Sequence, residues 1–462
     1  MIRPAFALLL VASSVLFISD ADAAWKAGVA KTKITPETPM AMSGYGGRDN
    51  PADGKLTDLW AKVAVLEDAS GNRGVIITLD LVGIDRTLSQ AICHSLHEKY
   101  GLERAQIAIC TSHTHTGPVV GRNLGPLHYL ILPPEQQALI DEYAAVLHAK
   151  VVAVVGDALA DVRPSQLSWG TGHATFAVNR RENKPYDKAR EWRTAGKLKG
   201  PIDHDVPVLA IHGESNATGE AGALRGVVFG YACHSTTLAF TQWSGDYPGY
   251  AQIELEQLHP GCVAMFWAGC GADQNPLPRS TVELAQHYGR RLADAVDFVL
   301  LTSELLPLSD GLTTKYTEVD LALGELPTKE QIETDTKSTN RYVVARAKML
   351  LEEIADGRPL SPTYPYPVQT WRIGSDIQFV TLGGEVVVDY AVRLKAELSG
   401  TKTWVAGYAN DVMAYIPSRR VLTEGGYEGG GAMVYYGLPT VWSPEVENSI
   451  VAEVHNQLTP QK

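Results

Sequence analysis

The sequence predicts an α/β fold in which mixed central β-sheets are flanked by helices. Short apolar runs that suit buried strands alternate with helical segments along most of the 462 residues. Hydrophobic residues make up 45% and charged residues 20% of the chain, as in ordinary globular proteins. The chain shows no internal repeat, low-complexity tract or flexible linker, so we expect residues 24–462 to form one domain.

Residues 1–23 are predicted to be a cleavable signal peptide. Arg3 supplies the positive start, residues 5–18 are apolar, and residues 21–23 offer small side chains for cleavage. The apolar run is too short to favour a membrane anchor, and no later segment is expected to span a membrane. The mature protein is therefore expected to be secreted or periplasmic.

Charge and cysteine content exclude some classes of protein. The formal net charge is -12, with no basic run of the kind that nucleic-acid binders carry, so we expect no nucleic-acid partner. The five cysteines cannot all pair within one chain. Most lie in apolar runs and are expected to be buried free thiols. A bridge between Cys262 and Cys270 is the alternative.

The first half of the chain reads as strands and helices in alternation. Strands are expected over residues 25–36, 60–67, 73–81, 106–110, 167–171, 176–178, 206–212 and 225–233. Helices are expected over residues 88–100, which end near a glycine, and 134–159, which begin with a proline and an acidic residue.

The second half continues the same alternation until a glycine-rich tail. Helices are expected over residues 250–258, 281–302, 328–354 and 386–398, and strands over 315–323, 377–382 and 403–406. The remainder, which includes the glycine-rich residues 425–431, is expected to be mostly loop.

Two histidines follow the apolar run 106–110, in the sequence Ser-His-Thr-His-Thr-Gly-Pro. In an extended backbone, residues two apart point to the same side, so His113 and His115 would project together. Neutral imidazole nitrogen is a good zinc ligand. A metal site and a pair of ordinary surface histidines remain equally open from this stretch alone, and a metal requires partners elsewhere.

Three further candidates stand at comparable positions. His234 follows the apolar run 225–233, and Glu385 follows a strand and two glycines, where it suits either a metal or a helix N-terminus. Ser244 suits a nucleophile or a turn, but it does not stand in a G-x-S-x-G elbow. Tyr415 and Tyr427 would be structural by pattern alone.

Taken together, these stretches resemble the catalytic domain of the neutral, non-lysosomal ceramidase family. The resemblance covers nearly the whole mature chain. It is carried by residues 28–36, 112–118, 179–180, 232–234, 244–251, 266–276 and 384–385, and by Tyr415 and Tyr427. It implies a neutral ceramidase-like zinc hydrolase domain over residues 24–462. The later immunoglobulin-like domain common in the family is expected to be absent.

The resemblance also implies a role for each candidate. One zinc ion per chain would be held by His113, His234, Glu385 and Tyr415. His115 would lie beside the scissile bond as the proton-transfer group. Arg180, Tyr427 and Ser244 match residues that line the catalytic centre in the family, and Ser244 matches a proposed nucleophile or substrate contact.

The implied activity is cleavage of the N-acyl amide bond of ceramide or a related N-acyl lipid by metal-activated water. The products would be a fatty acid and a sphingoid base or other amine. Zinc lowers the pKa of water to about 7 and polarises a carbonyl. The unperturbed pKa of a histidine, about 6.5, suits His115 to proton transfer. Arg180 and Tyr427 can donate hydrogen bonds to the developing oxyanion.

The partner expected is an amphiphilic lipid met at a membrane surface, and no protein partner is expected. Residues 44–50 are polar and residues 119–121 depart from the family pattern, so the expected substrate class includes N-acyl lipids related to ceramide as well as ceramide itself. Two alternatives remain: a metal-free serine hydrolase that uses Ser244, and an exported lipid- or glycan-binding protein without catalysis.

Overall fold

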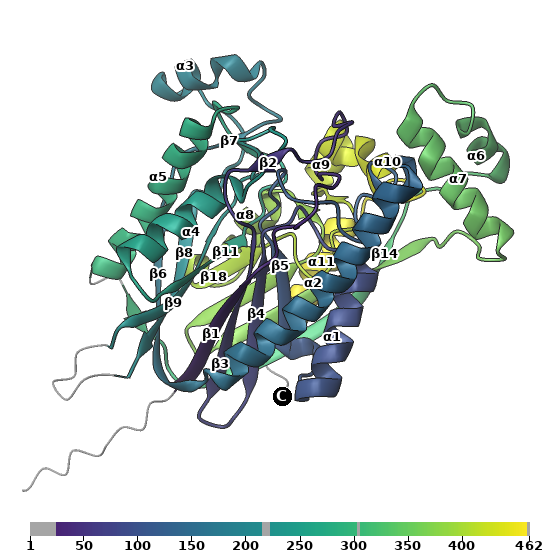
Figure 1. The fold of residues 1–462 in the computed structure, drawn as a ribbon. Coiled ribbons are helices and arrows are strands. Elements are labelled where there is room, and N and C mark those ends of the chain that lie inside the picture. Colours follow the sequence, from purple (N-terminus) through teal and green to yellow (C-terminus); the bar gives the residue numbers. More distant parts are fainter. Residues whose placement is uncertain (1–24, 215–221, 303–304, 460–462) are drawn as a thin grey trace, which may run out of the picture.

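A computed structural model describes residues 25–214, 222–302 and 305–459, so the predicted leader lies outside the described residues. Its largest element is a nine-stranded mixed sheet (Figure 1). In spatial order the strands are β11 (Val263–Ala268), β9 (Leu224–Tyr231), β8 (Asp205–Gly213), β6 (Arg163–His173), β1 (Trp25–Lys33), β3 (Trp60–Asp68), β4 (Arg73–Leu79) and β5 (Ile107–Thr111), with β13 (Leu306–Pro307) beside β6.

Strand alternation divides the core of this sheet into two faces. On β3, Val63 and Val65 pack toward helices, whereas Ala64 and Leu66 pack toward a second sheet. The helices that cover the outer face are α1 (Arg86–Tyr100), α2 (Pro134–Ala160), α4 (Asp246–Leu258) and α5 (Val282–Leu301).

The inner face is closed by a four-stranded sheet, which is itself covered by two helices. Its strands are β14 (Leu312–Ala322), β15 (Thr363–Ile373), β16 (Ile377–Leu382) and β18 (Thr403–Ala406), and its helices are α8 (Asp389–Glu397) and α11 (Val446–Leu458). Trp169, Trp267 and Trp404 fill the space between the two sheets. The nine-stranded sheet curves enough for β11 to contact β4 and β5, so the loops that follow distant strands meet.

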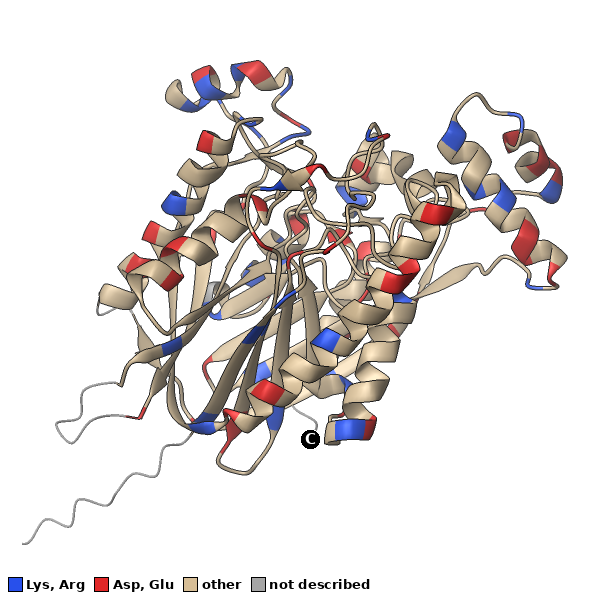
Figure 2. Cartoon of the chain, in the orientation of Figure 1, with Lys and Arg blue, Asp and Glu red and all other residues tan. Residues whose placement is uncertain are grey.

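Short elements complete the described chain. The two-stranded pairs are β2 (Gly54–Lys55) with β10 (Gln242–Trp243), β7 (Ala177–Asn179) with β12 (Gln274–Pro276), and β17 (Glu385–Val386) with β19 (Tyr415–Ile416). The remaining α-helices of the described residues are α3 (Ala189–Thr194), α6 (Lys329–Asp335), α7 (Arg341–Ala355), α9 (Arg419–Glu424) and α10 (Met433–Tyr436). Lysine and arginine are interspersed with aspartate and glutamate over the helices (Figure 2).

The predicted α/β architecture is confirmed, and most predicted elements are found within two or three residues of their predicted bounds. Among the longer elements, two strands and one helix were missed, namely β11, β15 and α11. The two- and three-residue strands other than β7 and the short helices α3, α9 and α10 were not predicted either. Residues 328–354 form two helices rather than one, because α6 ends at Asp335 and α7 begins only after Asn340, whose side chain caps it. The alternative bridge between Cys262 and Cys270 is wrong, since all five cysteines are free and buried.

Helix α2 corrects a second expectation. It is long and apolar enough, by length and composition, to cross a membrane, although no segment after the leader was expected to be. Ile140, Leu147 and Val151 on this helix are buried against the core that includes β1 and β3. Its apolar residues therefore contribute to packing on the sheet.

Candidate functional site

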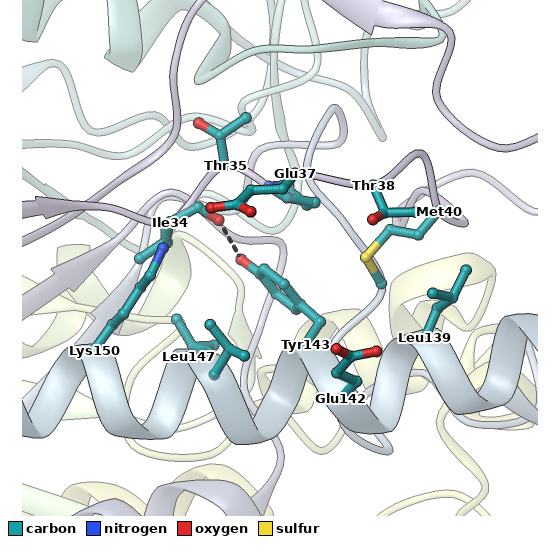
Figure 3. A pocket seen from close by; sticks show the side chains of 12 residues that line it. Ile34, Thr35, Glu37, Thr38, Met40, Leu139, Glu142, Tyr143, Leu147 and Lys150 are labelled. Carbon is teal, nitrogen blue, oxygen red and sulfur yellow. Dashed lines mark hydrogen bonds between the residues drawn. The ribbon is translucent and has the colours of Figure 1, made fainter.

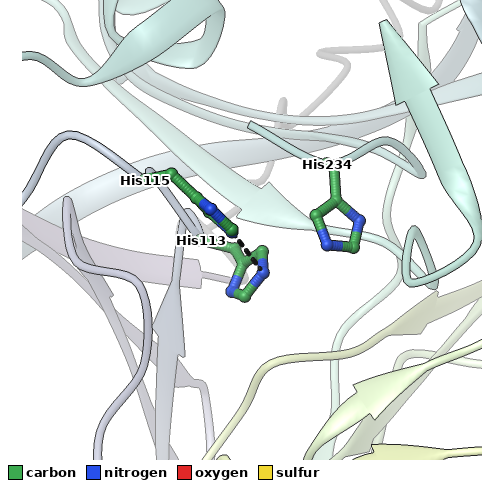
Figure 4. A group of neighbouring side chains, drawn as sticks. All are labelled: His113, His115 and His234. Carbon is green, nitrogen blue, oxygen red and sulfur yellow. Dashed lines mark hydrogen bonds between the residues drawn. The ribbon is translucent and has the colours of Figure 1, made fainter. Parts of the chain in front are cut away.

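The two histidines of the Ser-His-Thr-His motif lie just beyond the end of β5 (Figure 4). The prediction that an extended backbone aligns them is wrong, because His113 has a left-handed backbone with φ 57°. The turn nevertheless brings the two rings together, with 3.1 Å between the Nε2 atoms of His113 and His115. Both side chains are buried.

The hydrogen bonds of His113 and His234 fix the orientation of both rings. The Nδ1–H of His113 donates to the carbonyl of Val82 at 2.6 Å, and that of His234 donates to the carbonyl of Gly271 at 2.7 Å. Burial, together with the charge of Arg180, lowers the pKa of His234 to about 4. The neutral His234 ring therefore presents its Nε2 as a lone pair.

The carboxylate of Glu385 points at both of these rings. Its Oε2 lies 3.1 Å from Nε2 of His113 and 3.2 Å from Nε2 of His234, and it accepts no hydrogen bond. Burial raises the pKa of Glu385, whereas positive charge beside it, such as protonated His113 and His234 would carry, holds that pKa well below its usual range. The other oxygen, Oε1, accepts a short hydrogen bond from the Tyr436 hydroxyl. An ionised, buried oxygen thus faces two imidazole nitrogens.

Tyr415 joins the same group through a backbone pairing. The short strands β17 and β19 run parallel and place Tyr415 opposite Glu385. The Tyr415 Oη lies 3.3 Å from Nε2 of His234 and accepts a hydrogen bond of 3.1 Å from Nη2 of Arg180. Burial, with the charge of Glu385, raises the pKa of the Tyr415 phenol well above its usual value. The phenol is therefore protonated unless a cation lies beside it.

Arg180 and Tyr427 form the outer wall of the group. The Nε of Arg180 donates to Glu428 Oε1 at 2.7 Å, and its guanidinium carbon lies 5.7 Å from the centre of the Tyr427 ring. Tyr427 is 47% exposed and meets the Tyr415 ring edge to face. Arg180 is thus held beside the histidines, and Tyr427 faces the solvent side.

The spacing of these atoms suits a metal ion. A tetrahedral ion with bonds of 2.0–2.1 Å would place its ligand atoms about 3.3 Å apart. The separations between Glu385 and the two histidines, and between His234 and Tyr415, run from 3.1 to 3.3 Å. His113, His115 and His234 also form a buried group that could hold a metal. The residues present therefore fit such an ion.

His115 differs from the other two histidines in its hydrogen bonds. Its Nδ1 is buried without a hydrogen-bond partner, so no carbonyl fixes its tautomer. Burial, together with His113 and His234, lowers its pKa well below the usual value. Its ring meets the edge of Tyr45, with 4.7 Å between centroids. This histidine is neutral at neutral pH, and its Nε2 lies 3.1 Å from Nε2 of His113.

Ser244 lies outside the group, although sequence reasoning included it. Its Oγ accepts the backbone N–H of Asp246 at 3.1 Å, and its carbonyl accepts hydrogen bonds from the hydroxyls of Thr114 and Thr116. Among the described residues no histidine is hydrogen-bonded to its hydroxyl. These contacts join the turn after β10 to the loop that carries His113 and His115.

Several residues beside the group were missed from sequence. Tyr436 holds Glu385, Glu428 bridges Arg180 and Arg181, and the Tyr408 ring lies 4.4 Å from the His113 ring between centroids. The glycines around Glu428 were a visible signal for a special loop, whereas nothing in sequence marks Tyr408 or Tyr436.

A separate hollow of about 270 Å³ lies between the segment after β1 and helix α2 (Figure 3). It is lined by Met40, Leu139 and Leu147, and the Tyr143 hydroxyl donates to the carbonyl of Ile34 at 2.8 Å. None of its lining residues belongs to the histidine group, so the candidate metal centre and this hollow are different places.

A family model, a relative and two solved structures that match this chain are all of ceramidases. Residues 25–266 match the family model for the N-terminal part of neutral/alkaline non-lysosomal ceramidases. The chain is 23% identical over 509 aligned residues to the neutral ceramidase of Pseudomonas aeruginosa, an alignment that covers 94% of this chain and 73% of the relative.

Two solved structures share the fold. The crystal structure of the Pseudomonas aeruginosa neutral ceramidase superimposes with a TM-score of 0.69 at 20% identity, covering 95% of this chain and 74% of that one. A ceramidase complexed with C2 gives a TM-score of 0.70 at 18% identity, covering 94% and 76%.

Proposed function

The chain belongs to the neutral/alkaline non-lysosomal ceramidase family, and on that premise we propose that it hydrolyses the N-acyl amide bond of ceramide or a related N-acyl lipid with one zinc ion per chain. The products are a fatty acid and a sphingoid base or other amine. The proposed substrate is an amphiphilic lipid met at a membrane surface. The leader proposed over residues 1–23 makes the enzyme secreted or periplasmic.

The observation that carries the metal proposal is the contact between Glu385 and two imidazole nitrogens. The Nδ1–H groups of His113 and His234 donate to backbone carbonyls. The Nε2 atom of each neutral ring therefore carries no proton that it could donate to the Glu385 oxygen. Lone pairs that face one another at 3.1 and 3.2 Å in a buried site repel unless a cation joins them. A divalent ion supplies that cation.

Hydrogen bonding also separates ligands from the proton-transfer group. Metal-binding histidines usually donate their other ring N–H to a carbonyl or carboxylate. His113 and His234 do so, and His115 does not. We therefore assign His113, His234, Glu385 and Tyr415 as ligands and His115 as the neighbouring base. Two histidines and a carboxylate form a known donor set for catalytic zinc.

Each residue then has a task in amide hydrolysis. A zinc ion held there supplies a Lewis acid for the scissile carbonyl and lowers the pKa of water to about 7. His115 accepts the proton of the attacking water and returns it to the leaving nitrogen as the C–N bond breaks. Arg180 donates N–H groups to the oxygen that becomes negative, while Glu428 keeps the guanidinium in place.

Metal analysis combined with a turnover assay tests this proposal. We expect purified protein to hold about one zinc per chain and to hydrolyse a fluorescent N-acyl sphingosine. A strong chelator should remove both the zinc and the activity, and added zinc should restore them. Ser244→Ala serves as a comparison and should keep its zinc. Activity that survives complete metal removal but is blocked by a fluorophosphonate would show a serine hydrolase instead.

Zinc retention in acid is expected to reflect the depressed pKa of His234. Because that pKa is about 4 rather than the usual 6.5, protons do not compete for its Nε2 above pH 5. Zinc affinity should therefore be nearly level between pH 7 and 5 as far as His234 is concerned, and should fall steeply below about pH 4. Zinc content after equilibrium dialysis at each pH, with circular dichroism to exclude unfolding, measures this. Release centred near pH 6.5 would contradict it.

A further inference from the structure

Helices α6 and α7 form a hairpin that stands away from the two sheets (Figure 1). The chain leaves the four-stranded sheet after β14, makes this hairpin, and returns to the sheet at β15. Helix α7 contacts α10 and the short turn Tyr129–Ile131. Its first residues contact the loop of residues 43–50, which follows β1 in the chain and packs on His115.

Two adjacent residues of α7 donate hydrogen bonds to the same backbone carbonyl of this loop. The Tyr342 hydroxyl and Nη2 of Arg341 both donate to the carbonyl of Gly46, Arg341 at 2.7 Å and Tyr342 by a shorter bond. Arg341 also forms an ion pair with Asp49 at 3.3 Å, but both side chains are largely exposed. Exposed ion pairs contribute little, so the loop is held mainly by the hydrogen bonds to the Gly46 carbonyl, in which Arg341 also donates to the half-buried Tyr342 hydroxyl at 3.1 Å.

The same loop is packed directly on His115. Gly44 has φ 97°, and a Cβ placed there would lie 2.4 Å from Cγ of His115, so the backbone touches the imidazole ring. The Tyr45 ring meets the same imidazole edge to face, and Nη1 of Arg48 donates to the His115 carbonyl at 2.5 Å. A shift of the loop therefore shifts His115.

Tyr342 also touches the opposite rim of the centre. Its ring meets Tyr435 edge to face, with 5.3 Å between centroids, and the neighbouring Tyr436 holds the Glu385 carboxylate. The ring centroid of Tyr435 in turn lies 6.1 Å from that of the half-exposed Tyr427. One side chain of the hairpin thus contacts the segments on both sides of the metal centre.

We propose that Tyr342 is a positioning residue, through which the α6–α7 hairpin holds loop 43–50 and, with it, His115 against the metal centre. The proposal assigns the hairpin a task in catalysis although none of its residues touches the histidine group. Only the kinetic test of this proposal depends on the proposed function. The position of the loop can be measured without any substrate.

Two neighbouring glycines provide a matched kinetic test. A Cβ on Gly46 would lie 2.6 Å from the Tyr342 hydroxyl and 2.9 Å from Leu127, whereas a Cβ on Gly47 meets nothing within 4 Å. We expect Gly46→Ala to lower kcat about tenfold with zinc content unchanged, because small misplacements of catalytic groups cost this much or more. Gly47→Ala should retain wild-type kcat. Equal effects of the two substitutions would overturn the proposal.

A double variant tests whether Tyr342 is the group that responds. Tyr342→Phe removes the hydroxyl that the new methyl would strike, so Gly46→Ala combined with Tyr342→Phe should recover part of the lost kcat. Tyr342→Phe alone should lower kcat severalfold through the freed loop. A double variant no better than Gly46→Ala would show that Tyr342 does not hold the loop.

Hydrogen exchange gives the readout that needs no substrate. Amides of residues 43–50 should exchange faster in Tyr342→Phe than in the unmodified protein, with the core strands unchanged. Tyr316→Phe is the control, since that hydroxyl donates only to Glu318 on β14. Unchanged exchange in residues 43–50 would refute the positioning role. If no amide substrate were cleaved at all, the proposed function would fail while this measurement still decided the role of Tyr342.

Discussion

Glu385→Gln is expected to remove zinc and to lower kcat/KM at least about 10³-fold. The amide has the shape of the carboxylate but no charge to balance a divalent ion. Its N–H can instead donate to Nε2 of His113 or His234, which lie 3.1 and 3.2 Å from Oε2. The buried site would then be satisfied without a metal. We therefore expect the variant to be folded, with a thermal midpoint close to that of the metal-free protein.

Elemental analysis, a turnover assay and thermal unfolding together measure this result. Glu424→Gln is the matched control, since that carboxylate lies at the surface and, among the described residues, forms ion pairs only with Arg181 and Arg420. It should retain zinc and activity. A Glu385→Gln protein with full zinc and full activity would remove the ground for a metal centre at this place.

Arg180→Gln is expected to lower kcat by 10² to 10³ while leaving zinc bound. Removing a single donor to a developing oxyanion commonly costs about this factor. Arg180 is the residue whose guanidinium reaches both the Tyr415 hydroxyl, at 3.1 Å, and Nε2 of His234, at 3.4 Å. The loss should fall on kcat more than on KM, because the charge it faces develops only in the transition state.

The adjacent arginine provides the comparison for this variant. Arg181 shares the carboxylate of Glu428 at 2.8 Å and also pairs with Glu424, but it has no contact with His234 or Tyr415. Arg181→Gln should therefore change activity by less than about threefold. If the two variants were equally impaired, the effect would come from the Glu428 loop rather than from a donor at the reaction centre.

Sequence reasoning found the candidate metal centre because its histidines follow strand ends. His113 and His234 come two and three residues after the ends of β5 and β9, respectively, and such strand ends meet in a curved sheet. The reasoning from extended backbone was wrong in detail, since His113 is left-handed. Periodicity cannot reveal a single residue with positive φ.

Other parts of the site could not be found locally. The pairing of Glu385 with Tyr415 depends on β17 and β19, which have two residues each and carry no periodic signal. Ser244 matches a serine proposed in the family as a nucleophile or substrate contact, yet its hydroxyl accepts from the Asp246 amide. Only the three-dimensional arrangement separates these cases.

The missed elements have physical reasons as well. Strand β15 contains Pro365 and Pro367, which normally argue against a central strand. Both prolines pair with β14. They are tolerated because the pairing of β15 with β16 begins only at Val368, after both of them. Helix α11 follows a glycine-rich stretch, and its buried residues Val446, Ile450 and Val454 became meaningful only against β15.

The curvature of the nine-stranded sheet has a consequence for how the protein matures. The proposed donor atoms come from residues 113, 234, 385 and 415, so a fragment must span at least residues 113–415 to contain a complete set. An ion can be captured only after the ends of both sheets have docked, which makes loading a late event and links it to global folding. By mass action, a tightly held ion would then raise the resistance of the whole chain to denaturants and proteases, not merely that of the nearby loops.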